Sequence, residues 1–316
     1  MTRHAVTRRN LLCFAALAPA WAGIPLFAKT RIDKSRISAI TDEIGLTPED
    51  ALAFARQYGL KWIELRNIPG VKPGKEYAFC TEAELKQAAA SFSQAGVKVS
   101  FINTPLLKFG WPGTEPLRSR PETDEARARR LASEEKRWDR RREDFTKAVT
   151  AAKILGCDKI RIFTGSRVAD PKSMLPRIAE ELNALLPLAQ KEKVYLLVEN
   201  ENSQNVGTST EMAALMELMP SKWVGLNWDP QNELHLREPP FPEGYALLPK
   251  KRILNIQFKG KGIMPDSSEK LDWAAIIAQL DKDGYAHQIG LETHLFDGTL
   301  IQAAHTSMET MLRIVG

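Results

Sequence analysis

Short apolar segments alternate with longer segments of helical periodicity along most of this chain. Eight short segments rich in β-branched and aliphatic residues predict strands at 37–42, 62–66, 97–103, 159–164, 195–200, 224–229, 253–259 and 288–293. Between them, apolar residues recur at the three-to-four spacing of amphipathic helices at 48–58, 81–95, 123–155, 171–191, 208–219, 273–283 and 299–314, and more weakly at 241–248. Regular alternation of this kind favours a parallel sheet.

The boundaries of the predicted helices carry recognisable start and stop signals. Thr47-Pro48 and Thr81 with Glu84 three residues later are typical helix starts. Several predicted helices end at a glycine, which readily adopts the left-handed backbone that leaves a helix: Gly59, Gly96, Gly156 and Gly284. Eight such units predict one α/β domain at 35–316, a closed (β/α)8 TIM barrel. A doubly wound sheet is the alternative, but no glycine-rich phosphate loop follows the first strand.

One predicted unit, residues 105–159, is much longer than the others. It contains the loop 109–113 and then a long charged helix. Because loops that leave the carboxyl ends of barrel strands cover the active-site mouth, Trp111 is a candidate lid or stacking residue that contacts substrate. The alternative is that Trp111 only attaches the loop to the barrel.

The first 22 residues predict an export signal. Arg8 and Arg9 precede an apolar run at 11–21 that ends in small residues, with cleavage expected after Ala22. The paired arginines resemble a twin-arginine signal, which implies a periplasmic or otherwise exported protein. An uncleaved membrane anchor is the alternative, although the run is shorter than the roughly 20 residues that span a bilayer. We expect no membrane association once the signal is removed.

Composition and charge favour a globular protein that does not bind nucleic acid. Hydrophobic residues make up 43% of the chain and charged residues 26%. Removing residues 1–22 takes away three arginines and no acid, so the formal net charge falls from +5 to +2. The dense basic run at 127–142 is interrupted by acids, unlike the clustered basic face of nucleic-acid-binding proteins. The two cysteines that remain, Cys80 and Cys157, form no zinc motif.

Polar residues follow the apolar part of four late strands. Glu199, Asp229, Gln257 and Glu292 lie at or near the carboxyl ends of the fifth to eighth predicted strands. Side chains alternate along a strand, so the apolar residue before each carboxylate faces the other side. We therefore expect the three carboxylates to converge inside the barrel mouth, where barrel enzymes place their catalytic groups.

Three converging carboxylates would repel each other unless something neutralises them. Burying them unpaired would be very costly. Carboxylates with an amide oxygen suit Mn²⁺ or Mg²⁺, and Zn²⁺ or Co²⁺ become alternatives if an imidazole joins. This pattern predicts a divalent metal held by Glu199, Asp229, Gln257 and Glu292. For any single acid, capping of the next helix or pairing with a lysine or arginine stays open.

At this point the chain resembles a known family, the xylose-isomerase-like barrel superfamily of sugar phosphate isomerases and epimerases. The resemblance covers about 35–314 and rests on Val-Glu-Asn of the fifth strand, Trp-Asp of the sixth and Leu-Glu-Thr-His of the eighth. That family holds its metal with Glu, Asp, His and Glu on strands five to eight. By residue type the resemblance assigns Glu199, Asp229 and Glu292 as ligands.

Two departures from the family pattern affect this assignment. Gln257 stands where the family has the histidine of strand seven, and it is a weaker donor. The family epimerases often carry a histidine three residues after the aspartate of strand six. This chain has Asn232 there, with His235 three residues further on. His235 could substitute from the loop, or be only an exposed histidine.

The resemblance implies proton transfer next to a carbonyl, through an enediolate, on a non-phosphorylated sugar or keto-sugar. Glu199 and Glu292 would be the paired acid and base. Candidate substrate contacts are Glu64, Arg66, Trp111, Asn232, His235, Lys259 and His294. Lys259 could equally neutralise the acids, and Glu64 with Arg66 could form a simple salt bridge.

Two other functions stay open alongside the isomerase or epimerase. One is a lyase or dehydratase acting on 3-keto-glycosides or related polyols. The other is a non-catalytic carbohydrate-binding barrel that has lost its metal. The related DNA-repair endonucleases are disfavoured, because they hold several zinc ions with many histidines and this chain has five histidines in all. The expected partner is a small carbohydrate, and a homo-oligomer stays open.

Overall fold

The computed structural model of this chain describes residues 32–117, 121–263, 271–295 and 297–316. The predicted export signal, residues 1–22, lies outside these described residues. No helix in the described ranges combines the length and the apolarity needed to cross a membrane.

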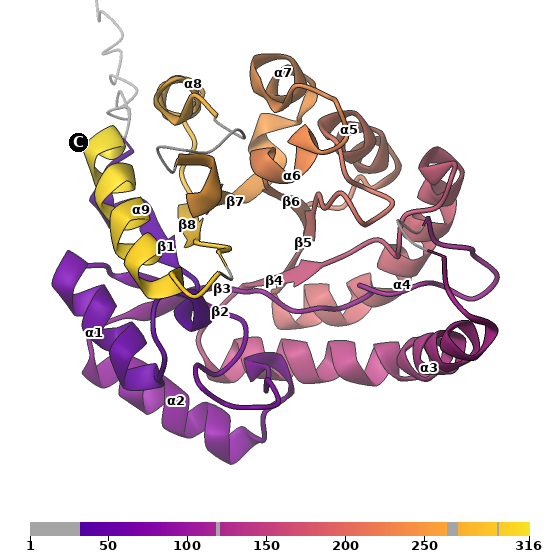
Figure 1. Cartoon of the computed structure of the whole chain (residues 1–316), viewed down its shortest axis with the longest axis horizontal. Coiled ribbons are helices and arrows are strands. Elements are labelled where there is room, and N and C mark those ends of the chain that lie inside the picture. Colours follow the sequence, from indigo (N-terminus) through magenta and orange to yellow (C-terminus); the bar gives the residue numbers. More distant parts are fainter. Residues whose placement is uncertain (1–31, 118–120, 264–270, 296) are drawn as a thin grey trace, which may run out of the picture.

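A ring of eight parallel strands forms the centre of the described molecule (Figure 1). The strands are β1 (Ile37–Ala39), β2 (Trp62–Leu65), β3 (Lys98–Ile102), β4 (Lys159–Ile162), β5 (Tyr195–Glu199), β6 (Val224–Trp228), β7 (Ile253–Lys259) and β8 (Gln288–Glu292). Each strand pairs with its neighbours in the sequence, and β1 pairs with β8. A parallel bridge between Ile40 and Glu64 closes the ring between β1 and β2. The predicted (β/α)8 barrel is therefore confirmed.

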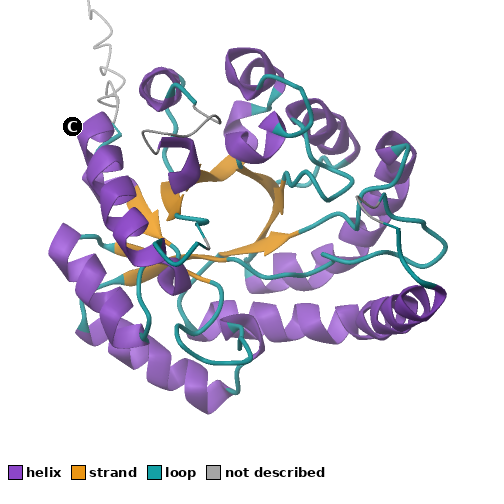
Figure 2. Cartoon of the chain, in the orientation of Figure 1, coloured by secondary structure: helices purple, strands orange, loops and turns teal. Residues whose placement is uncertain are grey.

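Helices surround the ring of strands on its outside (Figure 2). The α-helices are α1 (Pro48–Tyr58), α2 (Glu82–Gln94), α3 (Asp124–Ile154), α4 (Leu175–Glu192), α5 (Ser209–Leu218), α6 (Pro230–Leu234), α7 (Tyr245–Leu247), α8 (Trp273–Lys282) and α9 (Leu300–Val315). The shorter helices are η1 (Lys34–Arg36), η2 (Thr41–Glu43), η3 (Tyr77–Phe79), η4 (Pro171–Met174), η5 (Pro240–Gly244), η6 (Lys250–Arg252) and η7 (Gly260–Ile263).

The predicted start and stop signals set several of these boundaries. The side chain of Thr81 accepts a hydrogen bond from the Glu84 backbone, and the Glu84 carboxylate accepts one from the Thr81 backbone, which is a complete capping box. Gly59 ends α1 with a φ of 60°. The weakly predicted helix at 241–248 is instead divided into η5 and the three-residue α7. Phe241 has an extended backbone, with φ −149° and ψ 137°, because the following Pro242 disfavours the helical conformation of the residue before it.

One local difference from the sequence prediction matters for the site. The first strand was expected at 37–42, but β1 ends at Ala39 and the chain turns into η2. This turn brings Asp42 and Glu43 to the end of the barrel where the strands terminate, and both carboxylates bond to Arg66, which follows β2.

The inside of the barrel has an apolar layer beneath a polar one. Phe101, Leu197 and Leu254 form an apolar cluster separate from the main core. Leu197 lies two residues before Glu199 on β5, so this cluster lies nearer to the amino ends of the strands. The polar layer above consists of Ser38, Glu64, Asn103, Asn227, Asn255 and Gln257, which are all fully or almost fully buried.

Glu64 is the centre of this polar layer. Its two oxygens accept hydrogen bonds from Ser38, Asn103, Asn255 and Gln257 at 2.8–3.2 Å. Burial raises the pKa of Glu64, although these four donors oppose the shift. Four strands thus meet at one carboxyl group, which fixes the orientation of Gln257 below the mouth.

Gly290 of β8 leaves the space that Glu64 needs. A Cβ atom at Gly290 would lie 1.9 Å from Glu64 Oε1. We expect Gly290→Ala to destabilise the fold by about 1–3 kcal/mol, because the hydrogen-bonded Glu64 cannot move away. Urea unfolding measures this change. Gly74→Ala is the matched control, because the nearest atom to its Cβ is the side-chain oxygen of Asn67 at 3.3 Å. This substitution should change stability by about 0.5 kcal/mol or less.

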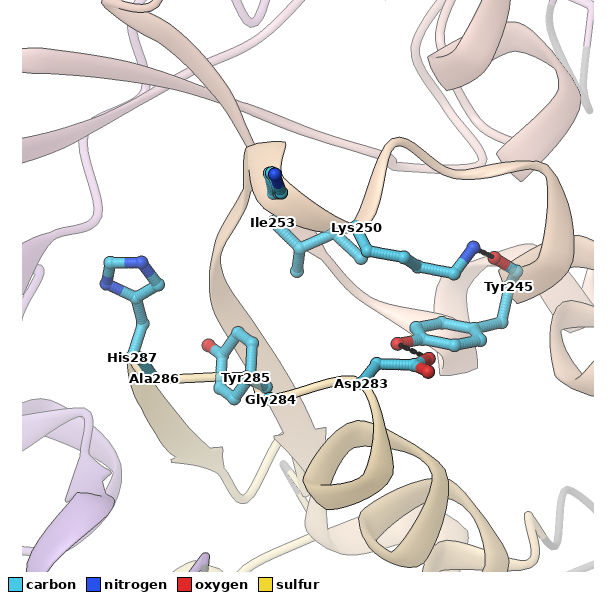
Figure 3. Close-up of a pocket in the computed structure, with 9 residues that line it drawn as sticks. Tyr245, Lys250, Ile253, Asp283, Gly284, Tyr285, Ala286 and His287 are labelled. Atoms are coloured by element: carbon cyan, nitrogen blue, oxygen red, sulfur yellow. Dashed lines mark hydrogen bonds between the residues drawn. The ribbon is translucent and has the colours of Figure 1, made fainter. Parts of the chain in front are cut away.

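A cavity of about 230 Å³ lies at the end of the barrel where the strands begin (Figure 3). It is lined by Ile253, where β7 starts, and by residues 283–287, which precede β8. The Tyr245 hydroxyl donates to Asp283 at its wall, as Figure 3 shows. The amino ends of barrel strands usually serve stability rather than catalysis, so the candidate site is expected at the carboxyl ends of the strands.

Candidate functional site

Four charged side chains gather where β5, β6, β7 and β8 end. They are Glu199, Asp229, Lys259 and Glu292, and none is more than 5% exposed. Lys259 lies directly beside Glu292 in the register of β7 and β8. The structure therefore brings the three predicted carboxylates to one mouth, with a lysine between two of them.

Glu199 is paired with a buried arginine of β4. Nη1 of Arg161 lies 3.2 and 3.1 Å from the two oxygens of Glu199. The Asn227 amide donates to the same carboxylate. Arg161 also donates to the backbone carbonyls of Thr104 and Asn103, so its guanidinium group has a fixed position. The Glu199 carboxylate therefore already has a bonded cation without a metal.

Asp229 is held by the start of α6 and by Lys259. Its Oδ1 accepts hydrogen bonds from the backbone amides of Gln231 and Asn232, as an N-cap residue does. Its Oδ2 lies 2.8 Å from Nζ of Lys259. The same Nζ donates to Oδ1 of Asn232 at 2.5 Å. Asp229 thus both starts a helix and holds the lysine.

Glu292 belongs to a second ion cluster on the side of β1 and β2. Nη1 of Arg66 donates to Glu292 at 3.3 Å, and Nη2 of Arg66 donates to Glu43 at 2.7 Å. Nδ1 of His294 lies 3.4 Å from Glu292, and the His294 backbone amide donates to Glu43 at 2.7 Å. Nζ of Lys259 is 3.6 Å from Glu292, which joins the two clusters.

The charges of Lys259 and its partners depend on one another. Burial opposes the charged form of Lys259, but Asp229 and Glu292 raise its pKa above the usual value. Burial likewise opposes ionisation of Glu292, while Lys259 and His294 hold its pKa well below the usual range. Burial raises the pKa of Asp229 to about 7 against the pull of Lys259, with Glu292 and Glu199 adding repulsion. Lys259 therefore stays a cation.

His294 connects the ion cluster to solvent. Its hydrogen bonds to Glu292 and Glu43 raise its pKa to about 9, and its side chain is 43% exposed. Its φ of 52° is unusual for a residue other than glycine, and its bonded backbone amide holds this conformation.

We expect the stabilising effect of His294 to depend on pH. The folded-state pKa lies above the unfolded value of about 6.5, so the contribution is fully present below pH 6.5 and is lost as the pH rises through 9. The difference in melting temperature between wild type and His294→Gln should shrink over that window. A constant difference from pH 6 to 10 would contradict this. His294→Lys, which stays charged across the range, should remove most of the pH dependence.

The predicted metal donors do not fit a divalent ion in this arrangement. Oδ2 of Asp229, Oε1 of Gln257 and Oε2 of Glu292 accept no hydrogen bond from the described residues, which alone would suit a cation. However, two of these oxygens already face Nζ of Lys259, at 2.8 and 3.6 Å. An ion about 2.1 Å from the same oxygens would have to displace the ammonium. Both oxygens of Glu199 are bonded to Arg161.

Another group in the described part of the chain could hold a metal ion. Glu43, Glu292 and His294 each offer one donor atom within 4.8 Å of the others. Arg66 bonds both carboxylates of this group, and the raised pKa of His294 keeps its ring protonated at neutral pH. A metal here requires His294 to lose its proton and Arg66 to withdraw.

The other residues predicted from the sequence lie at different depths. Arg66 and Asn232 are in the mouth, and Glu64 is fully buried beneath it. Trp111 is buried, and its ring packs against Trp138 of α3 at 5.3 Å rather than against the carboxylates. His235 is exposed at the end of α6.

Arg161 and Glu43 also belong to the site, although no sequence pattern predicted them there. Arg161 was hidden in a four-residue strand, although its alternation with Ile160 and Ile162 places a cation on the inner face. Glu43 was not predicted as a site residue because it lies in the short 3-10 helix η2 after β1, and no capping residue in the sequence indicates this helix. Arg161 donates to Glu199 at the mouth, and Glu43 accepts hydrogen bonds from Arg66 and from the backbone amide of His294.

Comparison with known proteins identifies the family that this barrel matches. Residues 52–313 match a family described as xylose isomerase-like TIM barrel. No curated protein matches the chain at a significant level.

Solved structures share the barrel at low sequence identity. A D-tagatose 3-epimerase-like protein is 11% identical with a TM-score of 0.64, covering 89% of this chain and 97% of that one. IolI protein with a bound zinc atom is 14% identical with a TM-score of 0.62, covering 89% and 98%. The 3-keto-D-glucoside 4-epimerase YcjR from E. coli is 14% identical with a TM-score of 0.61, covering 89% and 99%. At these identities the likeness establishes the fold.

Proposed function

Because this chain belongs to the xylose isomerase-like TIM barrel family, we propose that it is an isomerase or epimerase of a non-phosphorylated sugar or keto-sugar. Structures with the same barrel include a D-tagatose 3-epimerase-like protein and a 3-keto-D-glucoside 4-epimerase. The proposal rests on one observation above all. Two buried carboxylates, Glu199 at the end of β5 and Glu292 at the end of β8, lie in the same barrel mouth, and each contacts a cation of the protein.

Glu199 and Glu292 are the proposed acid and base. One removes the proton from the carbon next to the substrate carbonyl, and the other returns a proton at the neighbouring carbon or on the opposite face. Both carboxylates are held in place by bonded cations, Arg161 for Glu199 and Arg66 for Glu292. Fixed geometry of this kind is what proton transfer requires.

The remaining polar groups would recognise the substrate hydroxyls. Arg66, Asn232, Lys259 and His294 border the carboxylates in the mouth. Glu64 would act from below by orienting Gln257, and the exposed His235 would contact the substrate from the end of α6. Trp111 packs on Trp138 and would only attach its loop to the barrel. We further propose that the protein is exported by a twin-arginine signal, which is consistent with a substrate that carries no phosphate.

Deuterium incorporation tests this function without knowledge of the product. The purified protein is incubated in D₂O with free ketoses and with 3-keto-glycosides, in the presence of EDTA, Mn²⁺ or Mg²⁺. Exchange at the carbon beside the carbonyl with return of a sugar supports the isomerase or epimerase. Loss of the aglycone or of water would instead indicate a lyase. If no sugar exchanges under any condition while some still bind, the protein is a carbohydrate-binding barrel.

A further inference from the structure

We propose that the ammonium group of Lys259 takes the place of a divalent metal ion in the mouth of this barrel. The inference rests on the proposed proton-transfer function and specifies which group stabilises the negative charge that forms. The sequence predicts a metal ion between these carboxylates, but the structure shows them already in contact with cations of the protein itself.

The position of Lys259 is the first argument. Its Nζ lies 2.8 Å from Asp229 Oδ2 and 3.6 Å from Glu292 Oε2, between two of the three carboxylates predicted to share an ion. Lys259 is buried, and its ammonium lies between the carboxylates of Asp229 and Glu292. An ammonium with carboxylates on two sides is fixed in place by the same attraction that would hold a metal.

The charge balance of the mouth is the second argument. A metal is needed where carboxylates converge without partners. Here Arg161 pairs with Glu199, Lys259 pairs with Asp229, and Glu292 lies beside Lys259, Arg66 and His294, although Arg66 is shared with Asp42 and Glu43. Each predicted carboxylate ligand therefore already contacts a cation of the protein. Gln257 adds no charge, and its amide group donates to Glu64 below.

The unused hydrogen of Lys259 is the third argument. An ammonium has three donors. One is donated to Asn232 at 2.5 Å, and a second lies on the side of Asp229, whose Oδ2 is 2.8 Å away as an ion pair without hydrogen-bond geometry. The contact to Glu292 at 3.6 Å is too long for a good hydrogen bond. The third hydrogen is therefore free to be donated to a substrate oxygen beside Glu292.

Such a bond supplies the stabilisation that proton abstraction needs. A carboxylate of Glu292 or Glu199 takes the proton as the C–H bond breaks, and its electron pair forms the C=C bond of the enediol. The carbonyl π pair moves to oxygen, where the Lys259 ammonium stabilises the new negative charge. The second carboxyl group, in its protonated form, then gives its proton to the opposite face of the same carbon. The carbonyl re-forms as the C=C pair takes up this proton, and the first carboxyl group keeps the proton that it removed. No oxidant or other reactant is required.

Metal binding by the wild-type protein is the direct test and needs no substrate. The full chain is titrated with MnCl₂ by calorimetry, and its melting temperature is measured with Mn²⁺ and with EDTA. We expect no saturable binding tighter than a Kd of about 1 mM, which corresponds to about 4 kcal/mol. We also expect EDTA to leave the melting temperature unchanged. One Mn²⁺ per chain at a micromolar Kd would overturn the proposal.

Variants of Lys259 extend the test. Lys259→Met should allow Mn²⁺ to bind at least about 10-fold more tightly, since the freed oxygens need a new cation. Adding Gln257→His should tighten binding about 10-fold further. Lys259→Arg, which keeps the charge, is the control and should still exclude Mn²⁺. If Lys259→Met fails to fold, the wild-type titration still decides.

The outcomes separate this inference from the proposed function. Where a substrate is found, Lys259→Met should lower its exchange by about 10²-fold or more, and EDTA should not change the wild-type rate. Wild-type exchange that is lost with EDTA and restored by Mn²⁺ would keep the function and overturn the role of Lys259. Absence of exchange with all sugars would contradict the proposed isomerase or epimerase function. The Mn²⁺ titration would still show whether Lys259 excludes the metal.

Discussion

Glu292→Gln is expected to lower the rate of deuterium incorporation into the substrate by about 10²–10⁴-fold. The amide keeps the size of the carboxylate and one oxygen acceptor for Arg66, but it cannot accept a proton from carbon. Glu199→Gln should have a loss of the same order, because both carboxylates act on the same carbon framework. The measurement is the exchange rate in D₂O at saturating sugar.

Folding and general charge effects are controlled separately. Both variants should still unfold cooperatively on heating, as judged by circular dichroism. Glu243→Gln removes a carboxylate from the exposed part of η5 and should leave the rate unchanged. Full exchange by Glu292→Gln would show that β8 contributes only structure, and the paired-carboxylate mechanism would then be abandoned.

Arg161→Met is expected to destabilise the protein by about 3–5 kcal/mol. Glu199 is 2% exposed, and loss of the guanidinium would leave its carboxylate buried with Asn227 as its remaining donor. A loss of this size is a large part of the 5–15 kcal/mol that stabilises an ordinary domain. Urea unfolding of the purified variant measures it.

Two further variants test whether the loss of stability comes from an unpaired buried charge. Replacing both partners, as Arg161→Met with Glu199→Leu, should recover much of the stability, since no unpaired charge remains in the barrel. Arg127→Met breaks the exposed pair with Glu115, where both side chains are more than half exposed, and should cost about 1 kcal/mol or less. If Arg161→Met behaves like Arg127→Met, the pair of Arg161 and Glu199 has no special role in the fold.

The sequence by itself determined the architecture of this protein and the strand-end carboxylates. Side chains repeat every two residues along a strand and about every 3.6 residues along a helix, so the two kinds of segment can be told apart in the sequence. Their alternation was sufficient to predict eight βα units. Alternation along a strand also placed Glu199, Asp229 and Glu292 on inner faces, because the side-chain direction depends only on parity. The helix start at Thr81 was also predictable from the sequence, because its capping partner Glu84 is only three residues away.

Only the tertiary structure decided which charges meet. Arg161 and Glu199 are 38 residues apart, and Arg66 and Glu292 are 226 apart, so no local pattern joins them. The ring of strands brings them together because its closure sets β1 beside both β8 and β2. The position of Lys259 depends on the pairing of β7 with β8 and on the helix that Asp229 starts. Burial then makes these pairings costly to break, and it determines which cation the carboxylates face.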